Sequence, residues 1–220
     1  MARFAGRSRR SEHINRRVTQ SIFRGFDYAE HHGRTFNLYA VINLHETAEA
    51  SHVTIMERVR HKFRGWHRRT TKKLFGQPVP PFYAYVLENP NNHGHANFAV
   101  HVAPQLVAQF IRMLPKWVLK AQGVCGPFDV DIQEVEPGTH KGLANYILKG
   151  TDPAFLEHFH LTELYEKNGP QGIIYGKRAG LSQCLDAAAR NAGNFKKRRS
   201  KVSYPINPTQ PVVTPQWGHA

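Results

Sequence analysis

The sequence predicts an α+β fold in which helices flank a central antiparallel sheet. Short stretches rich in β-branched and aromatic residues alternate with longer segments of helical periodicity. The strands and helices do not follow the regular βαβ rhythm of a parallel fold. With 220 residues, 40% of them hydrophobic, the chain is long enough to bury a real core. We predict one domain over residues 34–193, between a basic N-terminal arm (1–33) and a basic, proline-containing disordered tail (194–220).

The arm precedes a first half of the domain with three expected strands and one long helix. Residues 1–33 show no clear periodicity, so we expect a flexible arm with at most a short helix. The expected elements that follow are a strand over 36–44, a helix over 48–73, a proline-rich break at 77–81, and strands over 82–87 and 95–102, paired as a hairpin.

Helices dominate the expected second half. Pro104 opens a helix, and Pro115 is expected to end it and to begin a short second one. The remaining predictions are an alternating strand over 128–135, a helix over 139–149 stopped by Gly150, a helix capped by Asp152-Pro153, a short strand over 172–176 and a last helix over 181–192.

Positive charge dominates the composition. Thirty Lys and Arg residues face sixteen acids, which gives a formal net charge of +14. Twenty of the thirty lie in three blocks, over residues 1–24, 58–73 and 196–201. Such blocks bind the phosphates of nucleic acids, although a basic surface can also serve solubility alone. The candidate DNA-binding residues are Arg60, Arg64 and Arg68, which recur every four residues on one helix face, with Lys177 and Arg178 downstream.

Other classes of protein are less consistent with the sequence. Two cysteines, Cys125 and Cys184, form neither a disulfide framework nor a zinc motif. No apolar run approaches the ~18–20 residues of a membrane span, and the N-terminus lacks a secretory hydrophobic region. We expect no membrane association and a cytoplasmic protein, bacterial or, if phage-encoded, in the host cell. An organelle transit peptide stays open on composition alone.

A cluster around residue 90 has the side chains of a metal site. Glu88 precedes His93-Gly94-His95-Ala96-Asn97, and residues two apart on a strand point to one face. A carboxylate with imidazole or amide ligands suits Mg²⁺ or Mn²⁺. The alternatives are a surface turn at His93 and His95, and a purely structural hydrogen bond from Asn97.

Downstream, Tyr146-Ile147-Leu148-Lys149 places a phenol three residues before an ammonium. On a helix the two side chains emerge on neighbouring faces. A tyrosine is a weak nucleophile unaided, but a nearby cation and a metal-bound phosphate would both assist it. The competing interpretation is that Tyr146 packs in the core.

Taken in this order, the motifs resemble those of the HUH endonuclease superfamily, specifically the rolling-circle replication initiators with one catalytic tyrosine. The resemblance covers residues 36–182. It consists of a first strand at 38–44, an acidic residue and histidines at 88–104, Tyr-x-x-Lys at 142–150 and a basic turn at 176–182.

The resemblance implies an RNA-recognition-motif-like sheet of about five strands with a metal on one face. Tyr146 would attack single-stranded origin DNA, and Lys149 would position the phosphate. A host helicase and DNA polymerase would be partners; the oligomeric state stays open. Aligned on the downstream residues, the family's two histidines fall on His95 and Asn97; read literally, the pair is His93 and His95. Both alternatives stay open.

Other functions fit parts of the same pattern. A single-tyrosine transposase or a small relaxase would use the same chemistry. A nucleic-acid-binding protein without catalysis, including an RNA-binding one, would use the basic surfaces, with Tyr83, Tyr85 and Phe98 stacking on bases.

Overall fold

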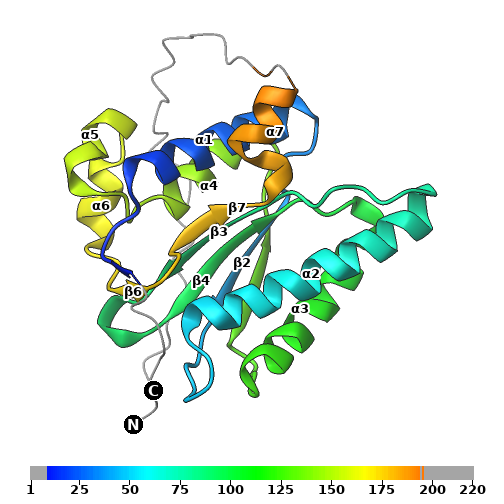
Figure 1. The fold of residues 1–220 in the computed structure, drawn as a ribbon, viewed down its shortest axis with the longest axis horizontal. Coiled ribbons are helices and arrows are strands. Elements are labelled where there is room, and N and C mark those ends of the chain that lie inside the picture. The colour runs from blue at the N-terminus through cyan, green and yellow to red at the C-terminus, as the bar shows by residue number, and fades with distance from the viewer. Residues whose placement is uncertain (1–8, 194, 196–220) are drawn as a thin grey trace.

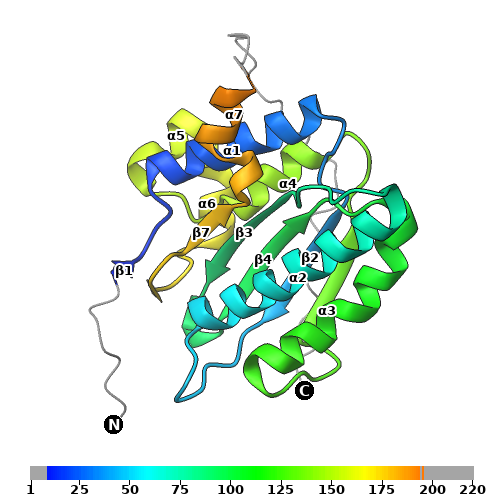
Figure 2. The same ribbon diagram turned by 45° about the vertical axis from the view of Figure 1, so that its right-hand side comes forward.

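A five-stranded antiparallel sheet forms the centre of the molecule, in the order β5-β2-β4-β3-β7. The computed structural model describes residues 9–193 and 195. Helices cover both faces of the sheet (Figures 1 and 2). The predicted α+β architecture is therefore confirmed. The expected tail over 194–220 lies outside the described residues, except for Phe195.

The register of the sheet brings two strand ends together. The strands are β2 (Leu38–Asn43), β3 (Tyr83–Glu88), β4 (His95–Val100), β5 (Val130–Glu134) and β7 (Ala179–Leu181). In the central hairpin His95 lies opposite Glu88 on one side and opposite Asn43 on the other. The predicted strand pairing of 82–87 with 95–102 is thus confirmed, and the candidate metal residues meet at one end of the sheet.

Two long helices cover one face. They are α2 (His52–Phe75) and α3 (Val107–Gln122). Ser51 caps α2 through a hydrogen bond to the amide of Thr54, and Gly76 ends it in the left-handed conformation. Between these helices and the sheet lies an aromatic core that includes Phe63, Phe98 and Phe110, all without exposed surface.

The other face is covered by α1 (Arg16–His31), α4 (His140–Ile147) and α7 (Ala187–Ala192). Ile22, Phe26 and Ala29 of α1 are buried here with Val86 of the sheet. The prediction of a flexible arm is therefore wrong for residues 16–31. These apolar residues recur at helical spacing between the arginines, and their burial holds the helix on the sheet.

Smaller elements complete the fold. A two-stranded ribbon pairs β1 (Arg10–Ser11) with β6 (Ile174–Tyr175). The others, within the described part of the chain, are α5 (Leu156–Phe159), α6 (Thr162–Asn168) and four short 3-10 turns at Pro90–Asn92, Pro104–Leu106, Pro153–Phe155 and Gln183–Leu185.

Two further expectations need correction. Pro115 does not end a helix, because α3 continues through it to Gln122. The carbonyl that loses its partner belongs to Ile111, on the exposed side of the helix, where water can replace the bond. The fifth strand is Ala179–Leu181, in the segment expected to be a turn, whereas the predicted strand at 172–176 contributes only Ile174 and Tyr175 to the ribbon.

None of the helices in the part of the chain that the structure describes is both long and apolar enough to span a bilayer.

Candidate active site

The candidate residues gather on the sheet face that α1 and α4 cover. Alternation along β3 and β4 places Glu88 and Asn97 on the same side as Val86 and Ala99, which pack against those helices. Lys149 follows α4 and reaches Glu88 from above the sheet. The structure thus brings Glu88 and Lys149 into direct contact although they lie 61 positions apart in the chain, and it places Asn97 on the same face of the sheet.

Glu88 is the electrostatic centre of this group. Its carboxylate is 1% exposed and accepts hydrogen bonds from Lys149 Nζ at 2.6 and 2.7 Å. His95 Nε2 lies 2.9 Å from Glu88 Oε2. Burial alone would raise the pKa of Glu88, but the charges and hydrogen bonds of Lys149 and His95 outweigh it and lower that pKa to about 2. The carboxylate is therefore ionised at neutral pH.

Asn97 is joined to a tyrosine that we did not predict. The Tyr39 hydroxyl donates to Asn97 Oδ1 at 2.5 Å, while Asn97 Nδ2 is buried without a partner. Burial raises the pKa of Tyr39 well above its usual range, and the charge of Glu88 adds to the effect. A buried amide with one unused donor is costly unless a ligand completes it.

Tyr146 stands beside this pair. Its ring meets that of Tyr39 edge to face, with centroids 6.1 Å apart, and Lys149 Nζ lies 4.4 Å from the Tyr146 centroid. Burial and the charge of Glu88 raise the pKa of Tyr146, against a hydrogen bond with Tyr39 that lowers it. The phenol is thus protonated at neutral pH. Tyr146 is partly buried and packs against the core cluster under α1 and α4, so its ring contributes to the packing that the competing interpretation expects.

His93 and Asn97 have different surroundings. His93 is exposed in the turn before β4, and its carbonyl lies 3.2 Å from His95 Nδ1. Asn97 is 1% exposed and lies two residues along the same strand face as His95. The geometry therefore favours Asn97 over His93 as the second candidate metal ligand beside His95. The backbone carbonyl of His93 instead orients the His95 ring.

Arg178 does not fit the expected role of a surface contact to DNA. It is 4% exposed, and its Nη2 donates to the carbonyls of Ser11, at 2.9 Å, and Gly172. Burial lowers its pKa to about 10, against the opposing effect of Glu88. Arg178 instead holds the β1–β6 ribbon against the end of the sheet.

The other predicted DNA contacts lie elsewhere. Arg64 and Arg68 are exposed on α2, which covers the opposite face of the sheet from Glu88. Arg60 is half-buried and stacks over the Tyr85 ring at 4.2 Å. Lys177 is exposed, one residue before the buried Arg178. The structure therefore does not bring the α2 arginines to the Glu88 group.

Tyr39 is the residue of the site that the sequence analysis missed. The sequence predicts a strand at this position and assigns Tyr39 no role in the site. One signal was present: a tyrosine alternating with Val41 in a buried strand needs a partner for its hydroxyl, and that partner must lie on the same sheet face.

The aromatic residues expected to stack on bases are unsuited to that role. Tyr83, Tyr85 and Phe98 are at most 3% exposed, under α2 and α3. A base could reach them only if these helices left the sheet.

A divalent cation would fit these residues only after a rearrangement, in which Lys149 leaves Glu88 and the hydrogen bond between His95 and Glu88 opens. Glu88 Oε, His95 Nε2 and Asn97 Oδ1 are donors suited to Mg²⁺ or Mn²⁺. The Lys149 ammonium, close to both carboxylate oxygens, stands where a bound cation would balance the same charge. Within residues 9–193 and 195, no three His, Cys, Asp or Glu side chains gather closely enough to hold a metal, so the amide would have to be the third ligand.

A scan against models of known protein families gives no match for this chain, and a search of curated proteins finds none that is significantly similar. The chemistry of the site itself therefore carries the functional interpretation.

Proposed function

We propose that this protein is a metal-dependent DNA strand-transfer enzyme that nicks and rejoins single-stranded DNA through Tyr146, as a replication initiator of rolling-circle type. The observation that supports this most is the convergence of Glu88, His95 and Lys149 beside Tyr146. A structural core would have little use for a buried carboxylate, an imidazole, an ammonium and two phenols in one place.

The reaction at Tyr146 is a transesterification. Its Oη attacks the phosphorus of a phosphodiester, and the bond from phosphorus to the 3′ oxygen breaks. The phenol proton ends on that oxygen, which leaves as a 3′-hydroxyl, while the 5′ phosphate stays on Tyr146. The free hydroxyl would prime a host polymerase, and attack by a hydroxyl on the phosphotyrosine would rejoin the strand.

The chain's own residues prepare this step. Lys149 places a positive charge 4.4 Å from the centroid of the Tyr146 ring, and this charge would help to offset the negative charge that develops on the phenol oxygen and the phosphate. Glu88, His95 and Asn97 would hold Mg²⁺ or Mn²⁺. A divalent cation bound there would polarise the scissile phosphate and offset its charge.

Covalent capture tests the proposal. A pool of random-sequence single-stranded oligonucleotides, labelled at the 3′ end, is incubated with the protein and Mn²⁺ and resolved on a denaturing gel. We expect a labelled, protein-linked band that chelation of Mn²⁺ removes. Sequencing the captured DNA then identifies the recognised site.

The matched control changes a single oxygen atom. Tyr146→Phe should abolish the band while keeping DNA affinity within about twofold of the wild type, because the ring remains. Tyr165→Phe, on α6, should leave capture unchanged. Capture that persists in Tyr146→Phe would contradict the proposed nucleophile.

One observation favours a second candidate, a DNA-binding protein without catalysis. The Lys149 ammonium already balances the charge of Glu88, and His95 lies within hydrogen-bonding distance of the same carboxylate, so the site is electrostatically complete without a metal. Binding of the oligonucleotide pool with no covalent band at any Mn²⁺ concentration would support this candidate.

A further inference from the structure

The β1–β6 ribbon presents an exposed aromatic ring beside cationic side chains. Tyr175 is 59% exposed, although it lies in a strand. It pairs directly with Arg10, so the two side chains project from the same face of the ribbon. Arg9, the residue before the ribbon, is also exposed, and so is Lys177, whose side chain lies over Gly180 of the neighbouring strand β7. The one acid in this group, Glu12, forms an ion pair with Arg10 at 2.9 Å.

The ribbon is held firmly in place. Arg178 bonds to the carbonyls of both Ser11 and Gly172, and the Gly176 amide donates to the Arg9 carbonyl at 2.9 Å. Ile174, the neighbour of Tyr175, is 1% exposed and packs in the core. Tyr175 is therefore presented to solvent by a fixed scaffold, which lowers the entropy cost of binding through it.

The ribbon also lies next to the candidate active site. The amide of Asn89, the residue after Glu88, donates to the Gln171 carbonyl at 2.9 Å, and residue 89 forms a β-bridge with Gly172. Figure 1 shows the ribbon beside the turn that joins β3 to β4. The segment that leads into β6 is therefore bonded directly to the residue that follows Glu88, which places the ribbon at the same end of the sheet as the candidate site.

We infer that this ribbon binds single-stranded DNA, with Tyr175 stacking on an unpaired base and Arg9, Arg10 and Lys177 contacting the phosphates on either side. Aromatic rings beside cations are the usual elements of single-strand binding, because every base has a face on which a ring can stack. The inference deepens the proposed function, but binding can be measured separately from cleavage.

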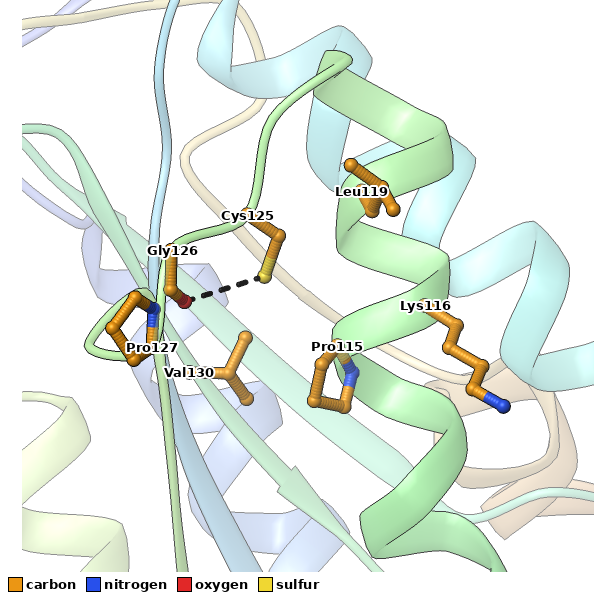
Figure 3. Close-up of a pocket in the computed structure, with 7 residues that line it drawn as sticks. All are labelled: Pro115, Lys116, Leu119, Cys125, Gly126, Pro127 and Val130. Atoms are coloured by element: carbon orange, nitrogen blue, oxygen red, sulfur yellow. Dashed lines mark hydrogen bonds between the residues drawn. The ribbon is translucent and has the colours of Figure 1, made fainter.

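A second exposed aromatic residue provides the control. Phe128 is 88% exposed, in the turn before β5. Its chain neighbour Pro127 lines a hollow together with Pro115, Leu119 and Val130 (Figure 3). The strand that follows carries Asp131 and Glu134, both exposed. Those carboxylates would repel phosphates, so we expect no DNA at Phe128 despite its greater exposure.

Fluorescence anisotropy with labelled oligo(dT) and a matched duplex tests the inference, with the full chain in chelator so that nothing is cleaved. Tyr175→Ala should weaken oligo(dT) binding about tenfold, within a range of about 5- to 150-fold. It should leave duplex binding and the salt dependence unchanged. Tyr175→Phe should keep the affinity, because the ring stacks and the hydroxyl does not.

The remaining variants separate charge from stacking. Lys177→Ala should weaken oligo(dT) binding and lower its salt dependence by about one phosphate contact. Phe128→Ala should match the wild type. Two results would overturn the inference: an affinity of Tyr175→Ala within about twofold of the wild type, or an equal loss from Phe128→Ala. Neither binding measurement depends on whether Tyr146 forms a covalent adduct with DNA. Failure of the nicking proposal can therefore be distinguished from failure of this inference.

Discussion

At the scale of single residues, one buried carboxylate organises the candidate site. Glu88 keeps its charge because Lys149 and His95 surround it, and burial together with this charge raises the pKa of both Tyr39 and Tyr146. Breaking a buried ion pair leaves an uncompensated charge, which is strongly destabilising. Lys149 is thus a structural partner in the metal-free protein and a competitor of any cation that Glu88 would bind.

Removing the Lys149 ammonium should therefore have two opposite effects. We expect Lys149→Met to lower the free energy of unfolding by about 3–5 kcal/mol without metal. Mn²⁺ should then raise the melting temperature of Lys149→Met more than that of the wild type, because the carboxylate is free. Thermal unfolding with and without Mn²⁺ measures both effects, and Lys116→Met, at an exposed position on α3, is the control. Equal Mn²⁺ shifts in all three proteins would refute competition for Glu88.

Two buried tyrosines offer a matched comparison of hydroxyl groups. The Tyr39 hydroxyl bonds to Asn97, whereas the Tyr85 hydroxyl is buried without a partner. Tyr39→Phe should cost about 1–3 kcal/mol because it leaves the Asn97 amide oxygen unsatisfied. Tyr85→Phe should be neutral or stabilising. Urea unfolding of both variants checks this, and a greater loss in Tyr85→Phe would contradict the Tyr39–Asn97 bond.

At the scale of secondary structure, the central hairpin and the helix that carries Tyr146 place the site. Strands β3 and β4 bring Glu88 opposite His95, and α4 lies across the same face so that Lys149 reaches them. Helix α1 closes this layer. Its burial of Ile22 and Phe26 makes it part of the fold that supports the site rather than an appendage.

The role of α1 can be tested by a cavity. Ile22 has no exposed surface, so Ile22→Ala should lower the free energy of unfolding by about 2–5 kcal/mol. Arg17→Ala, at an exposed position of the same helix, should change it by less than about 0.5 kcal/mol. Chemical denaturation measures both. An Ile22→Ala protein as stable as the wild type would mean that α1 does not pack on the sheet in solution.

The sequence predicted the central elements better than the edges. The strand over 36–44 and the long helix over 48–73 have clear periodicity, and both are present with small shifts of their ends. Ala179–Leu181 is only three residues long and contains Gly180, so its pairing with β3 depends on tertiary contacts. The same holds for Tyr39 and Arg178, whose partners are distant in sequence and become evident only once the sheet is assembled.

At the scale of the whole molecule, the sheet separates two surfaces. The arginines of α2 project from one layer, while Glu88, Asn97 and Tyr146 lie under the other. The ribbon with Tyr175 lies at the edge beside the site. A single strand of DNA bound at Glu88 would therefore lie at the same end of the sheet as the ribbon. Duplex DNA bound on α2 would have to pass around the sheet to reach the site.

Acid should destabilise the fold, and one buried histidine should contribute most to this effect because its pKa is lowered most among the histidines. His67 of α2 is 1% exposed, and its burial, with the charges of Arg34 and His101, lowers its pKa from 6.5 to about 4. The unfolded chain binds a proton at His67 more readily than the folded chain does. The stability that the neutral His67 contributes is therefore fully present above pH 6.5 and is lost as the pH falls towards 4. The free energy of unfolding should fall by an amount of the order of 3 kcal/mol over this interval.

Urea unfolding at pH 7 and pH 5 checks this sign. His67→Gln should flatten the dependence on pH in that interval, whereas His61→Gln, at an exposed position, should not. The ionised Glu88 loses its contribution only at lower pH, between about 4.5 and 2. A His67→Gln protein that is still destabilised as strongly as the wild type would place the titrating group elsewhere.

The most direct test of the account is the identity of the residue that becomes attached to DNA. The adduct formed with single-stranded oligonucleotides and Mn²⁺ is digested with protease and nuclease, and the modified peptide is sequenced by mass spectrometry. We predict a nucleotide 5′-phosphate on the oxygen of Tyr146 and on no other tyrosine. Attachment at a different residue, or nicking with no attached nucleotide, would contradict the proposal that Glu88, His95 and Lys149 serve Tyr146.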